Sequence, residues 1–111
     1  MDIVFKDKKL RKTMNDAGRR RKAFGSLAAI IGRRLDDLLA AATLHEAFGL
    51  PGRLEALTGN RQGQYSMRLD RNHRLILEAG NEPLPRKEDG GTDLRKVTVI
   101  RILGVEDYHQ R

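Results

Sequence analysis

The stretch that decides the fold is RQGQYSMRLDRNHRLIL, residues 61–77, together with KVTVIRILGVEDYH, residues 96–109. Over residues 64–70 apolar and polar side chains alternate, which is typical of a strand with one buried face. A tight turn is predicted at Arg71-Asn72, because Asn tolerates positive φ. The chain then returns as a strand over residues 73–78, so this stretch predicts an antiparallel pair.

A third strand is predicted over residues 96–106. It is apolar on both faces, as expected for a central strand covered by helices. Residues 79–95 contain two prolines, three glycines and many charged side chains, which predicts a long loop. Residues 53–57 form a further short predicted strand, after the chain break at Leu50-Pro51-Gly52.

The N-terminal half is predicted to hold a short strand and two helices. The strand covers residues 2–5, and the first helix begins after Asp7 as N-cap and ends at Gly18 as C-cap. The second helix covers residues 20–42, because apolar side chains recur there at helical spacing, at Phe24, Leu27, Ala28, Ile31, Leu35, Leu38, Leu39 and Ala42. Those expected to be buried against the sheet are Phe24, Leu27, Ile31, Leu35 and Leu38.

This order of elements predicts an α+β fold. Two N-terminal helices would pack on one face of a small, mostly antiparallel sheet, in a single domain over residues 1–111. The other face of the sheet would carry arginines and be free to bind a ligand.

The composition limits the classes of partner. The net charge of +7 is uneven, since residues 1–34 hold 11 Lys and Arg against 3 Asp and Glu, a net +8. This predicts a polyanionic partner, either nucleic acid or an acidic protein, with a solvated basic helix face as the alternative. There is no cysteine, and three histidines far apart make a weak metal site, so we expect no cofactor and no metal. No apolar run approaches the roughly 20 residues of a membrane span, and no signal peptide is evident, so we expect a cytoplasmic protein without membrane contact.

The end of the last strand carries groups suited to cleaving a phosphodiester. Asp107, Tyr108 and His109 supply a carboxylate, a phenol and an imidazole, and Arg74 supplies a fixed charge that can bind phosphate with two hydrogen bonds. His109 could act as acid or base, and Glu55 as base if an arginine lies close. Each also has a structural alternative, because Arg74 could be salt-bridged, Tyr108 could pack on the first helix, and Asp107 could pair with an arginine. His45 and His73 are expected to be surface residues.

The run PGRLEALTGNRQGQYSMRLDRNHRLIL, residues 51–77, followed by a strand ending in EDYH, resembles the HigB-type branch of the RelE/ParE superfamily. These are toxins of type II toxin–antitoxin systems, also called plasmid-maintenance killer proteins. The loop PRKEDGG, residues 85–91, resembles one subgroup of this branch. The resemblance implies a RelE-like fold and a toxin that cuts mRNA in the ribosomal A site without a metal, neutralised by a cognate helix-turn-helix antitoxin.

The family's site residues carry over in part. By position they are Arg74, Asp107, Tyr108 and His109, whereas Glu55 and Thr58 stand where the family commonly has His and Lys, and Asn60 stands where it has Asp. We expect a catalytic set made of Arg74, His109, Asp107, Tyr108 and Glu55. We expect RNA to be bound by Arg61, Arg68, Lys8, Lys9 and Lys12. Two alternatives remain, a DNA gyrase inhibitor of the ParE type and a toxin-derived module that binds antitoxin or RNA without catalysis.

Overall fold

The computed structural model describes residues 1–108. Its helices are α1 (Lys8–Asn15), α2 (Ala17–Phe24), α3 (Ala28–Ala40) and the one-turn α4 (Leu44–Ala47). Its strands are β1 (Asp2–Phe5), β2 (Glu55–Ala56), β3 (Gln64–Arg68), β4 (His73–Ala79) and β5 (Val99–Asp107). Short 3₁₀ helices are η1 (Gly25–Leu27), η2 (Gly59–Arg61) and η3 (Leu94–Lys96).

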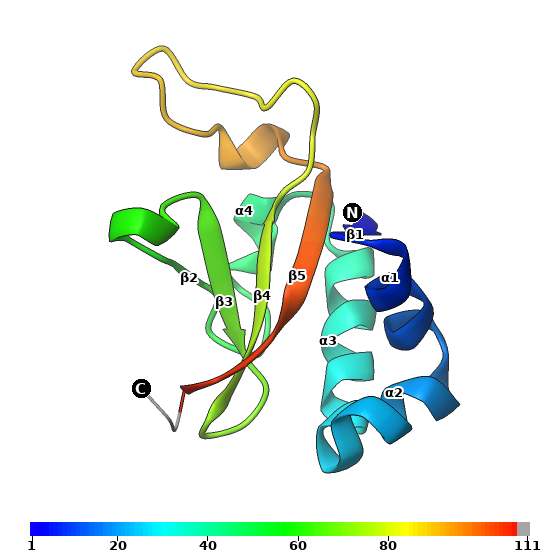
Figure 1. Ribbon diagram of the computed structural model, residues 1–111. Coiled ribbons are helices and arrows are strands. Elements are labelled where there is room, and N and C mark those ends of the chain that lie inside the picture. Colours follow the sequence, from blue (N-terminus) through cyan, green and yellow to red (C-terminus); the bar gives the residue numbers. More distant parts are fainter. Residues whose placement is uncertain (109–111) are drawn as a thin grey trace.

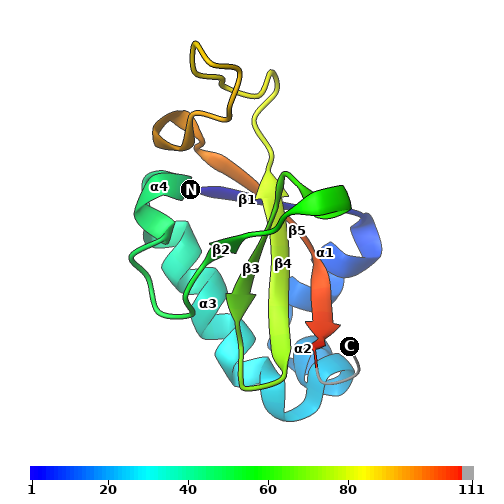
Figure 2. The same ribbon diagram turned by 90° about the vertical axis from the view of Figure 1, so that its left-hand side faces the viewer.

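The five strands form one sheet in the order β1-β5-β4-β3-β2. Neighbours are antiparallel except β1, which pairs with β5 in parallel. Helices α1, α2 and α3 lie on one side of this sheet (Figure 1), and Figure 2 looks onto the opposite side, which we call the open face. The predicted α+β fold, with helices on one face of a mostly antiparallel sheet, is confirmed.

The predicted helix over residues 20–42 is wrong as a single element. Gly25 has φ of 57°, a conformation that glycine adopts without strain, and it ends α2 before α3 begins at Ala28. Gly18 lies inside α2 and is not a C-cap. The residue between the first two helices is Asp16, whose carboxylate accepts a hydrogen bond from the Arg19 amide at 2.8 Å. Asp7 is the N-cap of α1 as predicted, accepting from the Leu10 amide at 2.8 Å.

The core lies between the helices and the sheet. Ile31, Leu35 and Leu38 of α3 are buried as predicted. Phe24 and Leu27 are only half-buried at the edge of the core, because the chain turns at the helix break that they flank. From the sheet, the fully buried side chains that meet α3 include Met67, Leu75, Leu77, Ile100 and Ile102.

Strand β5 departs from the prediction at its start and in its faces. It begins at Val99, because residues 94–96 form η3. Helices cover only one of its faces, so Ile100 and Ile102 are buried whereas Val99 and Leu103 are half-exposed.

A β-bulge interrupts the pairing of β5 with β4. Leu77 pairs with Ile102 and Ile76 with Gly104, so two residues of β5, Leu103 and Gly104, stand opposite one residue of β4. The extra residue reverses the alternation of β5. Val105 therefore packs with the core, and Glu106 faces the open side opposite Arg74.

Strand β2 is shorter than the strand predicted over residues 53–57. Arg53 has φ of 48°, which is outside the strand region, so ladder pairing with β3 begins only at Glu55. The loop after β4 projects beyond the end of the sheet (Figure 1) and is closed by a bridge between Arg86 and Thr92. Within residues 1–108, no helix has the length and apolar character that crossing a bilayer requires.

Candidate functional site on the open face

The open face gathers polar side chains because β3 and β4 alternate. Tyr65 and Met67 of β3 belong to the core, so Gln64, Ser66 and Arg68 project to the other side. The antiparallel registers align Arg68, Arg74 and Glu106 in one row across three strands. The adjacent row contains Glu55, Ser66 and Ile76. The predicted residues Glu55, Arg68 and Arg74 are thus brought onto one surface.

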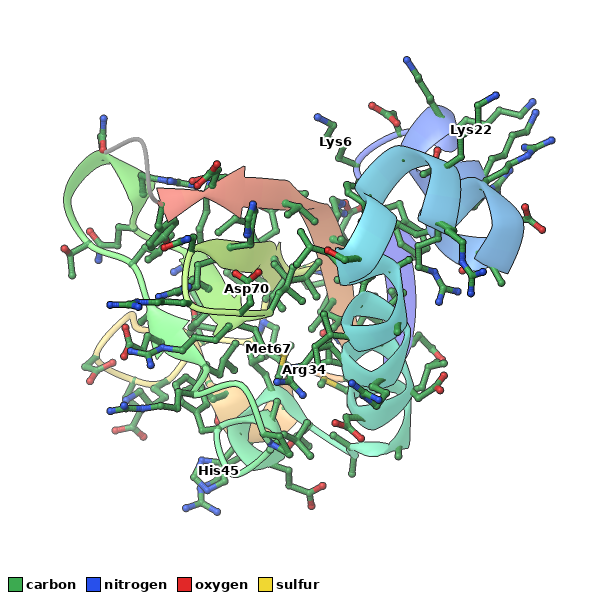
Figure 3. All side chains as sticks on the ribbon, turned by 90° about the horizontal axis from the view of Figure 1, so that it is seen from below. Lys6, Lys22, Arg34, His45, Met67 and Asp70 are labelled. Carbon is green, nitrogen blue, oxygen red and sulfur yellow. The ribbon has the colours of Figure 1, made fainter. Side chains whose placement is uncertain are left out.

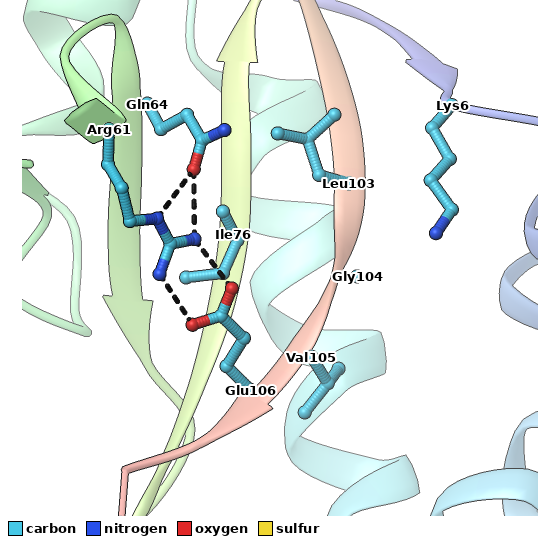
Figure 4. Close-up of a pocket in the computed structure, with 8 residues that line it drawn as sticks. All are labelled: Lys6, Arg61, Gln64, Ile76, Leu103, Gly104, Val105 and Glu106. Carbon is cyan, nitrogen blue, oxygen red and sulfur yellow. Dashed lines mark hydrogen bonds and ion pairs between the residues drawn. The ribbon is translucent and has the colours of Figure 1, made fainter. Parts of the chain in front are cut away.

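Arg61 projects from η2 and is held by two partners (Figure 4). Its Nη1 and Nη2 donate to the two carboxylate oxygens of Glu106 at 2.7 and 2.5 Å. Its Nε and Nη2 donate to Oε1 of Gln64 at 3.0 and 2.9 Å. The hydrogen bond to Glu106 raises the pKa of Arg61 above its ordinary value. This geometry neutralises much of the charge that Arg61 would offer to RNA.

A shallow hollow of about 460 Å³ lies beside this pair. Its apolar wall is formed by Ile76, Leu103 and Val105, and its polar wall by Lys6, Arg61, Gln64 and Glu106 (Figure 4). A cation, a carboxylate and apolar surface therefore meet at the centre of the open face.

Arg74 is held at the start of β4. Its Nη1 donates to the carbonyls of Asp70 at 3.0 Å, His73 at 3.1 Å and Arg71 at 3.4 Å. Its guanidinium carbon lies 4.8 Å from the centre of the Tyr108 ring, a cation–π contact. Among residues 1–108, the hydrogen bonds of the Arg74 side chain are all made by Nη1.

The C-terminal end of β5 is attached to the turn before β4. The Tyr108 amide donates to the Asn72 carbonyl at 2.5 Å. Asp107 lies with its Oδ2 at 3.8 Å from Nε2 of His73. The structure therefore brings Tyr108 and Arg74 into contact, and it places Asp107 beside a histidine. His109, the fourth predicted residue of this set, lies outside the described residues.

His73 was expected to be a surface residue, and it lies between two carboxylates, those of Asp70 and Asp107. Its Nδ1 lies 2.9 Å from Oδ1 of Asp70, which also accepts from the amides of Asn72 and His73, both at 2.8 Å. The side-chain hydrogen bond to His73, followed by these two backbone hydrogen bonds, lowers the pKa of Asp70. Asp70 and His73 were missed because local alternation does not show which carboxylate a turn residue meets.

Glu55 and Arg68 are both exposed on this face. Glu55 is opposite Ser66, so Arg68 is its diagonal neighbour across the two strands. Within residues 1–108 no ion pair joins Glu55 to an arginine. Arg68 is fixed through its backbone, since its carbonyl accepts from Nε of Arg34 at 3.0 Å and its amide donates to the Gly52 carbonyl at 2.7 Å.

The three predicted lysines lie elsewhere. Lys8, Lys9 and Lys12 are exposed on α1, in the helical layer behind the sheet. Figure 3 shows how far this layer extends, with Lys22 of α2 at its outer side and Asp70 at the turn between β3 and β4. The lysine that does line the hollow is Lys6. Lys8, Lys9 and Lys12 therefore form a separate basic surface.

Gln64 and Glu106 were not predicted as site residues. The alternation of β3 could have found Gln64, because it places this residue on the same face as Arg68. Glu106 could not be found that way, because strict alternation from Ile100 and Ile102 assigns it to the core, and only the bulge reverses this. Among residues 1–108, no three His, Asp or Glu side chains are grouped so that they could hold a metal ion.

Comparison with known proteins gives one family match. The model of a family described as "RelE-like toxin of type II toxin-antitoxin system HigB" matches residues 3–85. The match thus covers the helices and β1 to β4, and it ends before β5. No curated protein matches the chain.

Solved structures of similar fold have low sequence identity. A chain of the YoeB-YefM complex from Staphylococcus aureus is 18% identical, with a TM-score of 0.57, over 96% of this chain and 94% of that chain. The YoeB/ParE toxin from Agrobacterium tumefaciens is 14% identical, with a TM-score of 0.57, over 96% of this chain and 98% of that chain. The YoeB dimer from Staphylococcus aureus is 19% identical, with a TM-score of 0.51, over 94% and 92% of the two chains.

Proposed function

This chain belongs to the HigB-like family of RelE-like toxins of type II toxin–antitoxin systems, and from that premise we propose that it is an endoribonuclease that cuts mRNA on the ribosome. The observation that carries the proposal is the contact between Arg74 and Tyr108 on the open face, where Arg68 lies in the same row. A guanidinium beside an aromatic ring suits an RNA strand, because phosphate binds the guanidinium and a base stacks on the ring.

Arg74 is proposed to stabilise the transition state. In the reaction the 2′-oxygen attacks the neighbouring phosphorus and the 5′-oxygen leaves, so negative charge builds up on the other phosphate oxygens. A guanidinium that is held in place before the substrate binds stabilises this charge without having to reorganise. The three carbonyl contacts of Nη1 hold Arg74 in this way.

Two proton transfers complete the reaction. A base takes the proton of the 2′-hydroxyl, and an acid gives a proton to the leaving 5′-oxygen. We assign the base to Glu55, the exposed carboxylate on the row next to Arg74, and the acid to His109, with Asp107 and Tyr108 as orienting residues. Because Glu55 stands on a two-residue edge strand, we expect the ribosome to orient the RNA towards it.

The remaining basic residues are proposed to bind RNA. Arg68 lies in the row of Arg74 and would contact a neighbouring phosphate, and Arg61 would contribute once Glu106 is displaced or reoriented. Lys8, Lys9 and Lys12 would bind RNA from the helical side. Their side chains are exposed, and such contacts add affinity through release of counterions without reading sequence.

We also propose that a cognate helix-turn-helix antitoxin binds and neutralises this chain in the cytoplasm. The Staphylococcus aureus protein of similar fold was solved in a YoeB-YefM complex. The net charge of +8 on residues 1–34 favours an antitoxin with an acidic segment, so the association rate should fall as salt rises. Co-expression with the product of the adjacent gene tests this, since failure to form a complex and to restore growth would contradict it.

The reaction is tested with the purified full chain in a reconstituted bacterial translation system. Primer extension on the mRNA should show new 5′ ends when ribosomes are present and none when they are left out. Arg74→Ala should cleave about 10²-fold more slowly, the cost of removing one preorganised charge donor. Arg33→Ala is the matched control, because Arg33 is exposed on α3 and should leave the rate unchanged.

The other outcomes identify the alternatives. Intact mRNA together with inhibited DNA supercoiling would point to a gyrase inhibitor. Intact mRNA with normal growth on induction would point to a module that binds antitoxin or RNA without catalysis.

A further inference from the structure

The turn between β3 and β4 contacts two residues of the proposed site, Arg74 and Tyr108. Leu69 donates its amide to the His73 carbonyl at 3.0 Å and so closes the turn. The carbonyls within it accept hydrogen bonds from Nη1 of Arg74 and, at Asn72, from the amide of Tyr108. Any change in the shape of this turn would therefore move Arg74 and Tyr108 together.

The shape of the turn is set by a single carboxylate oxygen. Oδ1 of Asp70 accepts three hydrogen bonds, from the amides of Asn72 and His73 and from Nδ1 of His73, at 2.8, 2.8 and 2.9 Å. An ionised carboxylate can only accept, so Nδ1 of His73 is the donor and its proton is assigned by this contact. Charge-assisted hydrogen bonds of this length are among the stronger ones in proteins.

The second ring nitrogen of His73 is placed differently. Nε2 lies 3.8 Å from Oδ2 of Asp107, which is too long for a hydrogen bond. His73 is thus bonded on the Asp70 side and only near a charge on the Asp107 side. The two sides can be tested separately by substituting His73. The side-chain amide of Asn can take the place of the Nδ1 donor, and the longer side chain of Gln can place its amide where Nε2 lies.

We propose that Asp70 and His73 are positioning residues, which hold the β3–β4 turn so that the Arg74 guanidinium and the Tyr108 ring meet on the open face. The inference rests on the proposed function for its kinetic consequence. Neither side chain needs to touch RNA, because both act through Arg74 and Tyr108. The bond from His73 to Asp70 carries the effect, and the proximity to Asp107 does not.

The kinetic test is a double-mutant cycle in the reconstituted translation system. Asp70→Ala should lower kcat by about 10²-fold, the cost of a displacement near 1 Å at a catalytic group, and leave KM nearly unchanged. In an Arg74→Ala background the same change should have little further effect, because the residue through which Asp70 acts is gone. Asp36→Ala, an exposed carboxylate on α3, is the control. Equal losses from Asp70→Ala in the two backgrounds would overturn the proposal.

Three variants of His73 test which of its two ring nitrogens is required for activity. His73→Asn should keep most of the activity, whereas His73→Gln should lose as much as His73→Ala. His45→Ala is the control, since His45 is exposed on α4. If Gln restores activity and Asn does not, Asp107 is the relevant partner and the proposal is wrong.

A structural measurement separates this inference from the proposed function. Hydrogen exchange of the Tyr108 amide, followed by NMR, should be slow in the wild-type chain and in His73→Asn. It should be at least tenfold faster in Asp70→Ala, measured at a temperature at which all three chains are folded. This result is expected even if the wild-type chain cuts no RNA, in which case only the proposed function fails. Unchanged protection of Tyr108 in Asp70→Ala, or in Asp70→Asn should the alanine variant not fold, would overturn the positioning role.

Discussion

Arg61 and Glu106 meet through two parallel hydrogen bonds of 2.7 and 2.5 Å across the open face, although 45 residues separate them in the chain. The contact joins η2 to β5 over the strands between them (Figure 4). The two side chains are 25% and 38% exposed, so the pair contributes at most about 1 kcal/mol to folding. The pair also reduces the positive charge of the open face, which matters for the proposed binding of RNA.

This pairing predicts an unequal contribution of two arginines to RNA binding. Arg68→Ala should weaken binding of a single-stranded RNA by about fivefold, because one surface charge pair is worth about 1 kcal/mol. Arg61→Ala should weaken it less, because Glu106 already compensates the Arg61 charge. Glu106→Gln should strengthen binding. Affinities measured over a range of salt concentrations would check this. The slope of log affinity against log salt concentration should be less steep for Arg68→Ala, by about the amount that one phosphate contact contributes.

Two adjacent leucines of α3 predict how stability depends on burial. Leu38→Ala should lower the free energy of unfolding by about 2–5 kcal/mol, because its side chain is fully buried and leaves a cavity. Leu39→Ala should change it by less than about 0.5 kcal/mol, because 56% of this residue is exposed. Urea denaturation of the two variants tests the placement of the core, and similar losses from both would contradict it.

The lowered pKa of Asp70 predicts that the stability of the fold depends on pH. The carboxylate binds a proton less readily in the folded chain than in the unfolded chain, so its stabilising contribution is present above the unfolded pKa. It is lost as the pH falls through the folded pKa. Asp70→Asn should therefore destabilise the chain near neutral pH and have less effect in strong acid. Denaturation curves of the two chains should differ at pH 7 and converge as the pH is lowered through the folded pKa of Asp70.

The position of Glu55 predicts that replacing it by histidine will not slow mRNA cleavage. It is exposed on an edge strand of two residues, where its carboxylate is held by no ion pair within residues 1–108. We expect it to contribute less than the histidine that the family commonly has at this position. Glu55→His should leave the rate of mRNA cleavage equal or raise it, measured by primer extension under the same ribosome concentration. A loss like that of Arg74→Ala would show that the carboxylate itself is required.

The architecture could be predicted because it depends on patterns of local sequence. The alternation over residues 64–70 and the apolar stripe of Ile31, Leu35 and Leu38 both required a buried face, and both lie where expected. The helix break at Gly25 was not predicted, because the spacing of apolar residues continues across it. The parallel pairing of β1 with β5 joins residues nearly a whole chain apart, and local patterns do not contain that information.

The sequence named candidate site residues, whose roles stay predictions, but it did not show their contacts. Arg74 and Tyr108 were each named as candidates, and the structure places them in contact at the same end of the sheet. The partners of His73 and Arg61 depend on which strands and turns meet in three dimensions. A surface histidine and a bonded one look alike in sequence, and so do a free arginine and a paired one.

The bulge at Leu103 and Gly104 bears on how relatives of this chain should be aligned. Because these two residues stand opposite Ile76 alone, a protein lacking one of them would have a regular ladder there. Its next residues would still project as Val105 and Glu106 do, one to the core and one to Arg74. A one-residue gap at this point of β5 is therefore expected to be neutral, whereas a gap between Val105 and Tyr108 would exchange the inner and outer side chains. The number of residues can differ by one here while the side chains of the open face stay in place.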